Sequence, residues 1–214
     1  MIKILFCVNK LSIGGVERRL SQLMVGLYKL RTYSLHCIVN NNERLLDPEL
    51  GNYVNIITIN PQTQKEVIVE QYKKVICDIK PDIVHCWTMS QCEIINALEQ
   101  QFRSNFIYIC GAVNSAYKYA INSHRYLLMK DCLKKADIIL SNSDAGIKAK
   151  HIPLEKSLVI KNGYNFERLD FIDNSHLDEN IKTQMSNYEN IILMACRICM
   201  EKDIQMGSVA KPCV

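Results

Sequence analysis

Two adjacent glycines, Gly14 and Gly15, separate an apolar run from an amphipathic stretch near the start of the chain. The run, residues 2–8, contains a single charge, as is typical of a strand buried on both faces of a parallel sheet. From Val16 onward, apolar residues recur at helical spacing. A helix that follows a strand in this way directs its N-terminal N–H groups at the carboxyl edge of the sheet. These groups can bind a phosphate there, and the missing Cβ atoms let the backbone turn tightly and approach it.

This turn lacks the pattern of a dinucleotide-binding protein. That pattern is Gly-x-Gly-x-x-Gly, with an acidic residue about 20 residues further on. Here the turn is Ile-Gly-Gly-Val-Glu, and the second predicted strand ends at Val39 with three asparagines behind it. The sequence therefore disfavours a nicotinamide-dependent oxidoreductase. It leaves open whether the glycine turn binds a phosphate or only connects two elements.

An imidazole and an indole follow a short apolar stretch in the middle of the chain. His85 ends this predicted strand and would face the cleft at the carboxyl edge of the sheet, where it could contact a ligand. It could equally be a hydrogen-bonded histidine that supports a loop. Trp87, the single tryptophan, could stack on a ligand or pack in the core. We find no Ser/His/Asp set for nucleophilic catalysis.

The chain has ten cysteines, and their placement argues against disulfides. Cys7, Cys37, Cys110 and Cys196 fall inside predicted strands, where cysteine behaves as a small buried hydrophobe. No signal peptide precedes the first strand, so we expect a reducing cytoplasm. The pair Cys196-x-x-Cys199 lacks two further ligands at suitable spacing, so we expect no metal and no cofactor.

Composition and charge set further bounds. The chain has 214 residues, 48% of them hydrophobic, and a net charge of +4. This charge permits phosphate-bearing ligands or an anionic membrane surface, and no basic block is long enough to predict nucleic-acid binding. The apolar runs are far shorter than the ~20 residues of a membrane span.

Strands alternate with helices along most of the chain, which predicts an α/β fold with a doubly wound parallel sheet. We expect strands at 2–8, 35–39, 54–59, 82–85, 105–110, 137–140 and 157–161. We expect helices at 16–30, 61–79, 94–102 and 116–136, with Ser143 as the N-cap of a further short helix.

A polar stretch interrupts this alternation. Residues 166–189 are rich in Asn, Asp and Glu, and a new apolar strand follows them. We therefore predict a Rossmann-like domain at 1–165, a linker at 166–189, and the first strand and loop of a second domain at 190–214. So few residues cannot form a domain core.

Four motifs in this order resemble the N-terminal domain of glycosyltransferase family 4, whose members are nucleotide-sugar enzymes of the GT-B fold. Residues 14–17 match the family's Gly-Gly-x-Glu loop, and residues 136–143 match its Ala-Asp-x-Ile strand. Residues 159–165 match its Asn-Gly segment, with Asn165 where the family usually has Asp. Residues 192–202 resemble the opening of the donor-side domain.

The resemblance implies a site for the donor's diphosphate. The family's Arg and the Lys five positions later contact this diphosphate, and they correspond to Arg197 and Lys202, with Gly14 and Gly15 close by. A guanidinium and an ammonium can neutralise a diphosphate before and during its departure. The alternative for the two cations is an ordinary solvated pair.

The sequence departs from the family at two places. Many relatives carry a His or an Arg just after the fifth strand, whereas this chain has Cys-Gly-Ala-Val-Asn ending at Asn114, a poor candidate for a catalytic residue. The resemblance implies that His85, Trp87 and Asn114 could contact the sugar or the acceptor. After Lys202 the family continues into an apolar helix, but Gly207 and Pro212 interrupt one here. We therefore expect a truncated donor-side domain, and no catalytic residue is identified.

The resemblance implies transfer of a hexose from a nucleoside diphosphate sugar to a glycan or lipid-linked acceptor, in surface polysaccharide biosynthesis. The alternative is a non-catalytic binding remnant of such an enzyme. The predicted helix at 117–135 mixes tyrosines with lysines. It could lie on the inner face of a membrane, as some relatives do, or could be a core helix with a solvated face.

Overall fold

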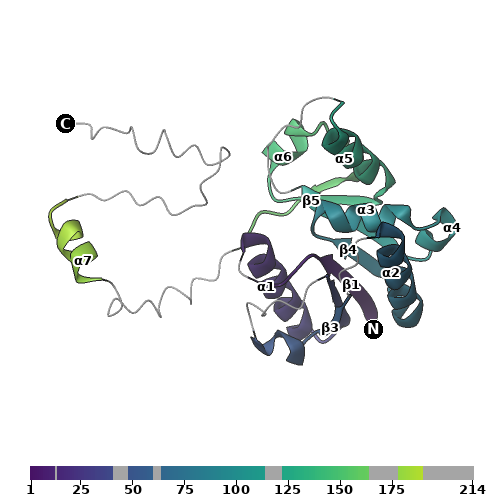
Figure 1. Cartoon of the computed structure of the whole chain (residues 1–214), viewed down its shortest axis with the longest axis horizontal. Helices are drawn as coiled ribbons and strands as arrows, with labels where there is room; N and C mark the ends of the chain where they lie inside the picture. Colours follow the sequence, from purple (N-terminus) through teal and green to yellow (C-terminus); the bar gives the residue numbers. More distant parts are fainter. Residues whose placement is uncertain (13, 41–47, 60–63, 114–121, 164–177, 190–214) are drawn as a thin grey trace. The chain divides into compact units, whose positions relative to one another are not determined.

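The computed structural model describes residues 1–12, 14–40, 48–59, 64–113, 122–163 and 178–189. Two compact units divide the chain, Met1–Gly163 and Tyr164–Val214. The first unit contains the whole sheet (Figure 1). In the second unit the described element is α7 (Glu179–Ser186), which lies within the predicted linker.

The sheet has seven strands, all parallel, in the order β3-β2-β1-β4-β5-β6-β7. The predicted doubly wound α/β fold is therefore confirmed. The strand order reverses between β1 and β4, and the carboxyl ends flanking this switch point are where open α/β sheets bind ligands. The strands are β1 (Ile2–Val8), β2 (Tyr33–Val39), β3 (Asn55–Thr58), β4 (Ile83–Cys86), β5 (Ile107–Val113), β6 (Ile138–Ser141) and β7 (Ser157–Val159).

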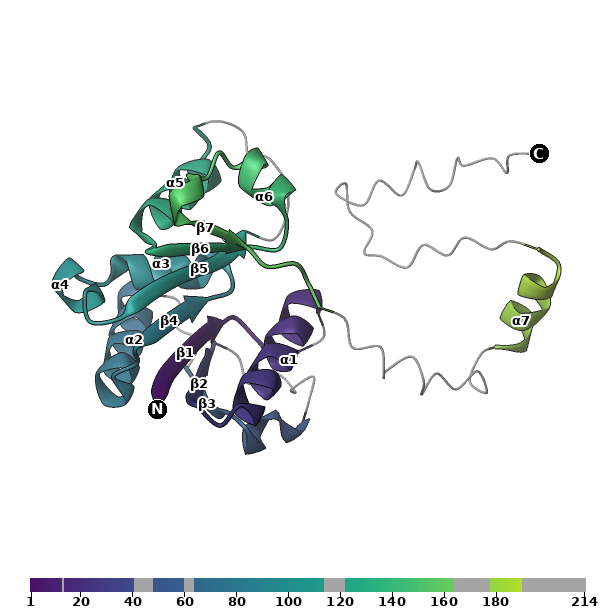
Figure 2. The same cartoon turned by 180° about the vertical axis from the view of Figure 1, so that it is seen from behind.

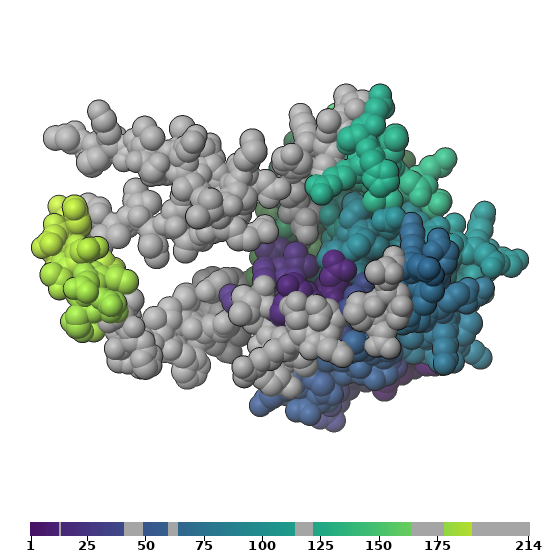
Figure 3. All heavy atoms as spheres, viewed as in Figure 1, coloured from purple at the N-terminus to yellow at the C-terminus, as the bar shows by residue number. Residues whose placement is uncertain are grey.

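Helices cover the two faces unequally. Alternate residues of β1 face opposite sides: Leu5 and Cys7 pack with side chains of α2, α3 and α5, whereas Ile4 and Phe6 pack with α1. Figure 2 shows the face of the sheet that carries α1, with β4–β7 also in view. Figure 3 is seen from the other side, where atoms of α2 and α3 form part of the surface. The helices of the first unit are α1 (Gly15–Lys29), α2 (Lys65–Ile79), α3 (Met89–Ala97), α4 (Gln100–Arg103), α5 (His124–Lys135) and α6 (Asp144–Ala149).

The predicted helix at 94–102 is wrong in its extent. The structure has two helices, α3 and α4, separated by the extended residues Leu98 and Glu99. Leu98 leaves the helical path and buries its side chain in the core, which apolar spacing does not reveal. The first turn of α3 contains the fully buried Gln91, whose Nε2 donates to Asn9 Oδ1 at 2.7 Å. This bond ties the end of β1 to the β4–α3 connection.

The predicted helix at 116–136 also begins later than expected. Asn122 has a φ of 66°, a left-handed conformation that does not continue into a helix. Ser123 then caps α5, because its side chain accepts from Tyr126 N at 3.2 Å. Residues 114–121 lie outside the described part of the chain. The predicted N-cap at Ser143 is correct, since its Oγ accepts from Gly146 N at the start of α6.

Most of the described cysteines are buried in this core. Cys77 is exposed, and the other six are buried, among them Cys7, Cys37 and Cys110 in the strands as predicted. Burial raises the pKa of the Cys37 thiol. Cys196 lies outside the described residues. These thiols act as small hydrophobic side chains, and the described residues contain no disulfide and no cluster of three or more potential metal ligands.

None of the helices that the structure describes is long and apolar enough to cross a membrane.

Two aspartates at the amino edge of the sheet accept hydrogen bonds from backbone N–H groups of neighbouring strands. Asp82, just before β4, accepts a hydrogen bond from Lys3 N in β1 at 2.7 Å. Asp137, just before β6, accepts from Tyr108 N in β5 at 2.8 Å. Each carboxylate satisfies a backbone donor where the ladder of the neighbouring strand begins. The aspartate of the motif at 136–143 therefore has a structural role, far from the carboxyl edge.

We predict that Asp137→Ala lowers the free energy of unfolding by about 1–3 kcal/mol, because a backbone donor loses its charged acceptor. Urea denaturation followed by circular dichroism measures this. Asp78→Ala, which removes an exposed carboxylate of α2, serves as the matched control and should change stability by less than about 0.5 kcal/mol. Equal effects of the two variants would contradict the role of Asp137.

Candidate functional site

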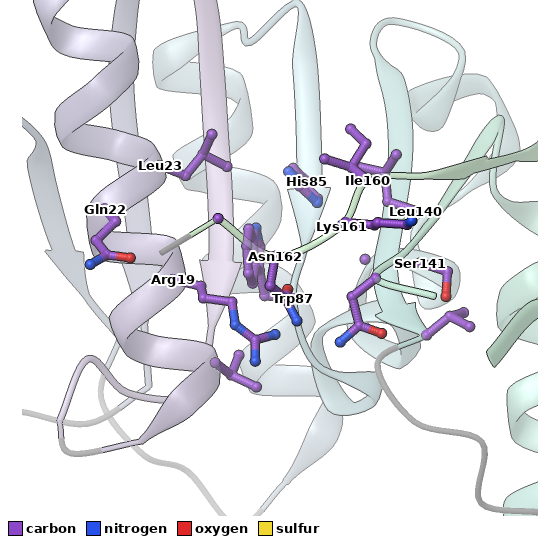
Figure 4. A pocket seen from close by; sticks show the side chains of 15 residues that line it. Arg19, Gln22, Leu23, His85, Trp87, Leu140, Ser141, Ile160, Lys161 and Asn162 are labelled. Atoms are coloured by element: carbon purple, nitrogen blue, oxygen red, sulfur yellow. The ribbon is translucent and has the colours of Figure 1, made fainter. Parts of the chain in front are cut away.

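A cavity of about 350 Å³ lies at the carboxyl edge of the sheet. Its floor is formed by the ends of β4, β5 and β6, one wall by α1, and the other wall by the segment that follows β7 (Figure 4). The location follows from the topology, because the carboxyl ends of parallel strands meet at one edge.

Three of the four family-like motifs meet at this cavity. Val16 lines it next to the glycine turn, residues 140–142 line it at the end of β6, and residues 160–163 line it after β7. These stretches are more than a hundred residues apart at the extremes, so the sheet alone brings them together. The turn after β6 is held by Ser141 Oγ, which donates to Ser143 O at 2.8 Å.

His85 is buried at the floor of the cavity. Its ring packs against those of Phe6 and Trp87, with centroid distances of 5.7 and 5.2 Å. Burial lowers the pKa of His85 from 6.5 to about 3, so the imidazole is neutral near pH 7. A neutral imidazole can exchange a hydrogen bond with a hydroxyl but does not attract an anion by charge. The contact of His85 with a sugar or acceptor stays a prediction.

Gly111 makes room for this imidazole. A Cβ on Gly111 would lie 2.7 Å from His85 Nε2 and 3.1 Å from the backbone oxygen of Cys86. Any other residue would therefore displace the histidine or separate β5 from β4. Sequence reasoning did not find this role, because the partner atoms lie on another strand.

Trp87 packs in the core and also lines the cavity, and its contact with an acceptor stays a prediction. Its side chain packs against the cluster formed by α1 and β1. Its Nε1 is buried and has no hydrogen-bond partner among the residues that the structure describes.

The glycine turn leaves open space rather than forming a strained loop. Neither Gly14 nor Gly15 has a positive φ, so the turn does not need the left-handed conformation. A Cβ on Gly15 would meet no atom within 4 Å, whereas one on Gly14 would collide with the carboxylate of Glu17. The space above Gly15 is accessible to a ligand. Binding of the donor's diphosphate by these glycines stays a prediction.

Three other predicted site residues, Asn114, Arg197 and Lys202, lie outside the described residues. Conversely, the structure places Arg19 and Lys161 at the cavity, and sequence reasoning singled out neither for chemistry. For each residue, its position relative to a motif could have indicated a place at the cavity. Arg19 follows Gly15 by four residues, about one helical turn, and Lys161 directly precedes the Asn-Gly pair of a motif.

The doubly wound sheet with a cavity at its switch-point edge defines a ligand-binding α/β domain. Residues 17–143, more than half of the chain, match the family model described as glycosyl transferase 4-like. The chain belongs to this family, as its motifs predicted. A comparison with curated proteins found no match.

Solved structures share the fold. The apo form of the lipopolysaccharide outer core galactosyltransferase WaaB is 16% identical, with a TM-score of 0.57, over 77% of this chain and 46% of its own. HepE from Anabaena, solved with UDP-glucose, is 14% identical, with a TM-score of 0.63, over 89% and 51%. A putative UDP-N-acetylglucosamine 2-epimerase from Listeria monocytogenes is 18% identical, with a TM-score of 0.55, over 75% and 45%. The chain spans about half the length of these proteins, and the likeness shows the fold alone.

We predict that Gly111→Ala destabilises the protein by about 1–3 kcal/mol, because the added methyl group overlaps His85 and the Cys86 carbonyl. Gly26→Ala is the matched control: its Cβ meets nothing, and it should stabilise α1 by up to about 1 kcal/mol. Thermal and urea unfolding measure both. A Gly111→Ala variant as stable as the wild type would show that His85 moves aside without cost.

We also predict a pH dependence from His85. The folded pKa of about 3 lies below the unfolded value near 6.5, so unfolding takes up a proton between these pH values. The contribution of neutral His85 to the free energy of unfolding is complete above pH 6.5. Between pH 6.5 and about 3, this free energy decreases by about 1.4 kcal/mol for each unit by which the pH falls. His85→Gln should remove this part of the pH slope, measured by urea denaturation. An NMR titration with the His85 ring protonating near pH 6.5 would contradict the prediction.

Proposed function

We propose that this chain forms the acceptor-side part of a glycosyltransferase that moves a hexose from a nucleoside diphosphate sugar to a glycan or lipid-linked acceptor. Membership of the glycosyl transferase 4-like family supports glycosyl transfer. The structure of HepE in complex with UDP-glucose supports a nucleotide sugar as the donor. We place the reaction in surface polysaccharide biosynthesis on the cytoplasmic side of a membrane, where lipid-linked acceptors are exposed.

One observation carries the proposal: three motif stretches that are distant in the sequence converge on one cavity at the carboxyl edge of the sheet. A set of motifs that served only the core would be spread over the fold. Their meeting at the switch-point edge is what a substrate site in an open α/β sheet requires.

The chemistry assigns different tasks to the groups of the site. The bond between the sugar's anomeric carbon and the oxygen of the donor phosphate breaks, and the oxygen of an acceptor hydroxyl forms the new bond to that carbon. The hydroxyl proton leaves with the departing diphosphate or passes to the solvent. Negative charge develops on the departing diphosphate, which we assign to Arg197 and Lys202. His85 and Trp87 line the side of the cavity that we assign to the sugar and acceptor.

The chain should bind a nucleoside diphosphate. We expect UDP or GDP to bind in the micromolar range and to raise the melting temperature, because a ligand selective for the folded state stabilises it. Calorimetric titration and thermal shift measure this. Arg197→Ala and Lys202→Ala should each weaken binding at least tenfold, since each removes a charged partner of the diphosphate. Arg18→Ala on the exposed side of α1 should leave binding unchanged.

Transfer is measured separately, as release of nucleoside diphosphate that depends on an added glycan or lipid-linked acceptor. The alternative function, a binding module without catalysis, predicts acceptor binding with no such release. If no nucleotide binds, or if the Arg197 and Lys202 variants bind as well as the wild type, the diphosphate assignment is wrong.

A further inference from the structure

Two cationic side chains, those of Arg19 and Lys161, line the cavity. Arg19 extends from the second turn of α1, and Lys161 belongs to the segment after β7, on the opposite wall (Figure 4). Neither forms an ion pair or a side-chain hydrogen bond with any residue in the described part of the chain. Among the described residues that line the cavity there is no Asp or Glu.

Stabilisation of the fold does not explain why Arg19 and Lys161 carry positive charges at this cavity. A cation that supports a fold is normally found in a salt bridge or at the last turn of a helix, as Lys182 is with Glu179 at 2.7 Å. Arg19 instead lies in the second turn of α1, away from the C-terminal turn where the helix dipole favours a cation. Two like charges facing one concave space create a positive potential that is focused by the low-dielectric walls.

Neutral groups complete the environment around the cations. In Figure 4 Arg19 reaches toward Trp87 and Asn162, and the buried Nε1 of Trp87 has no partner among the described residues. His85 at the floor is uncharged near pH 7. The remaining walls are largely apolar, with Leu23 and Leu140 among them. This combination suits a ligand that has an anionic group attached to a carbon skeleton, because a free inorganic anion would leave the apolar walls unused.

We propose that this cavity recognises an acceptor saccharide that carries an anionic group, a phosphate ester or a carboxylate, through Arg19 and Lys161. This proposal rests on the proposed function and narrows its substrate class. The guanidinium of Arg19 can bind two oxygens of such a group side by side, and Lys161 supplies a second positive charge. The donor's diphosphate is assigned to other residues, Arg197 and Lys202, so the two anions do not compete.

The test compares three hexose ligands on the full chain by calorimetric titration: glucose 6-phosphate, glucuronate and glucose. We expect at least one of the two anionic ligands to bind at least tenfold tighter than glucose, and the comparison between them identifies the anionic group. Affinity should fall as sodium chloride is raised from about 50 to about 500 mM, because salt screens the charge attraction. Binding of glucose as tight as that of both anionic ligands would overturn the proposal.

Variants connect the effect to the two cations. Arg19→Gln and Lys161→Gln should each reduce the affinity for the anionic ligand at least tenfold, with Arg19→Lys intermediate because it keeps the charge but not the fork. Arg18→Gln, one residue away and outside the cavity, is the matched control and should have no effect. Each substitution keeps a polar side chain, and melting curves confirm that each variant is folded.

Titration of the same variants with UDP separates this proposal from the donor assignment. We expect Arg19→Gln and Lys161→Gln to bind UDP as the wild type does. A parallel loss of UDP binding would show that the two cations hold the donor's diphosphate, and the acceptor assignment would be wrong. If UDP fails to bind the wild type while glucose 6-phosphate still binds through Arg19, the donor part of the proposed function fails and the anion site stands.

Discussion

The parallel pairing of β1 with both β2 and β4 is the constraint on which the rest of this structure depends. Every crossover must return to the same end of the sheet, so all connections that follow a strand accumulate at one edge. The cavity is a consequence of this geometry. The strands β2 and β3 lie on one side of β1 and β4–β7 lie on the other, and a hollow remains between α1 and the segment after β7. Hydrogen bonds from Gln91 and Ser90 to Asn9 hold the switch point in place.

Charge and burial divide the site into two parts with different chemistry. The floor contains a histidine that burial keeps neutral, a glycine that makes room for it, and an indole whose buried donor has no partner among the described residues. The walls contain the cationic side chains of Arg19 and Lys161. A neutral floor suits hydroxyl groups, and cationic walls suit oxyanions. A sugar with an anionic substituent presents both kinds of group, which is why we favour it over a neutral acceptor.

The apolar pattern predicted the class of fold because a strand covered on both faces must be apolar on both, and the seven strands predicted within residues 1–165 all exist. The pattern failed where tertiary contacts override local preference. The helix predicted at 94–102 breaks because Leu98 is needed in the core, and α3 begins early because Asn9 satisfies the buried Gln91. Neither contact is visible in a window of a dozen residues. The helix predicted at 116–136 begins only at His124, because Ser123 caps it and Asn122 is left-handed.

The sequence by itself determined the alternation of strands and helices, the glycine turn, the family to which the chain belongs and the position of His85 at a strand end. These properties depend on local periodicity and on residues close together in the chain. The tertiary structure decided which side chains share a cavity. Arg19 and Lys161 are far apart in the sequence, and only the order of the strands places both on one hollow. It also decided that Gly111 must be a glycine and that His85 is neutral, because clashes and desolvation arise from atoms that are distant along the chain.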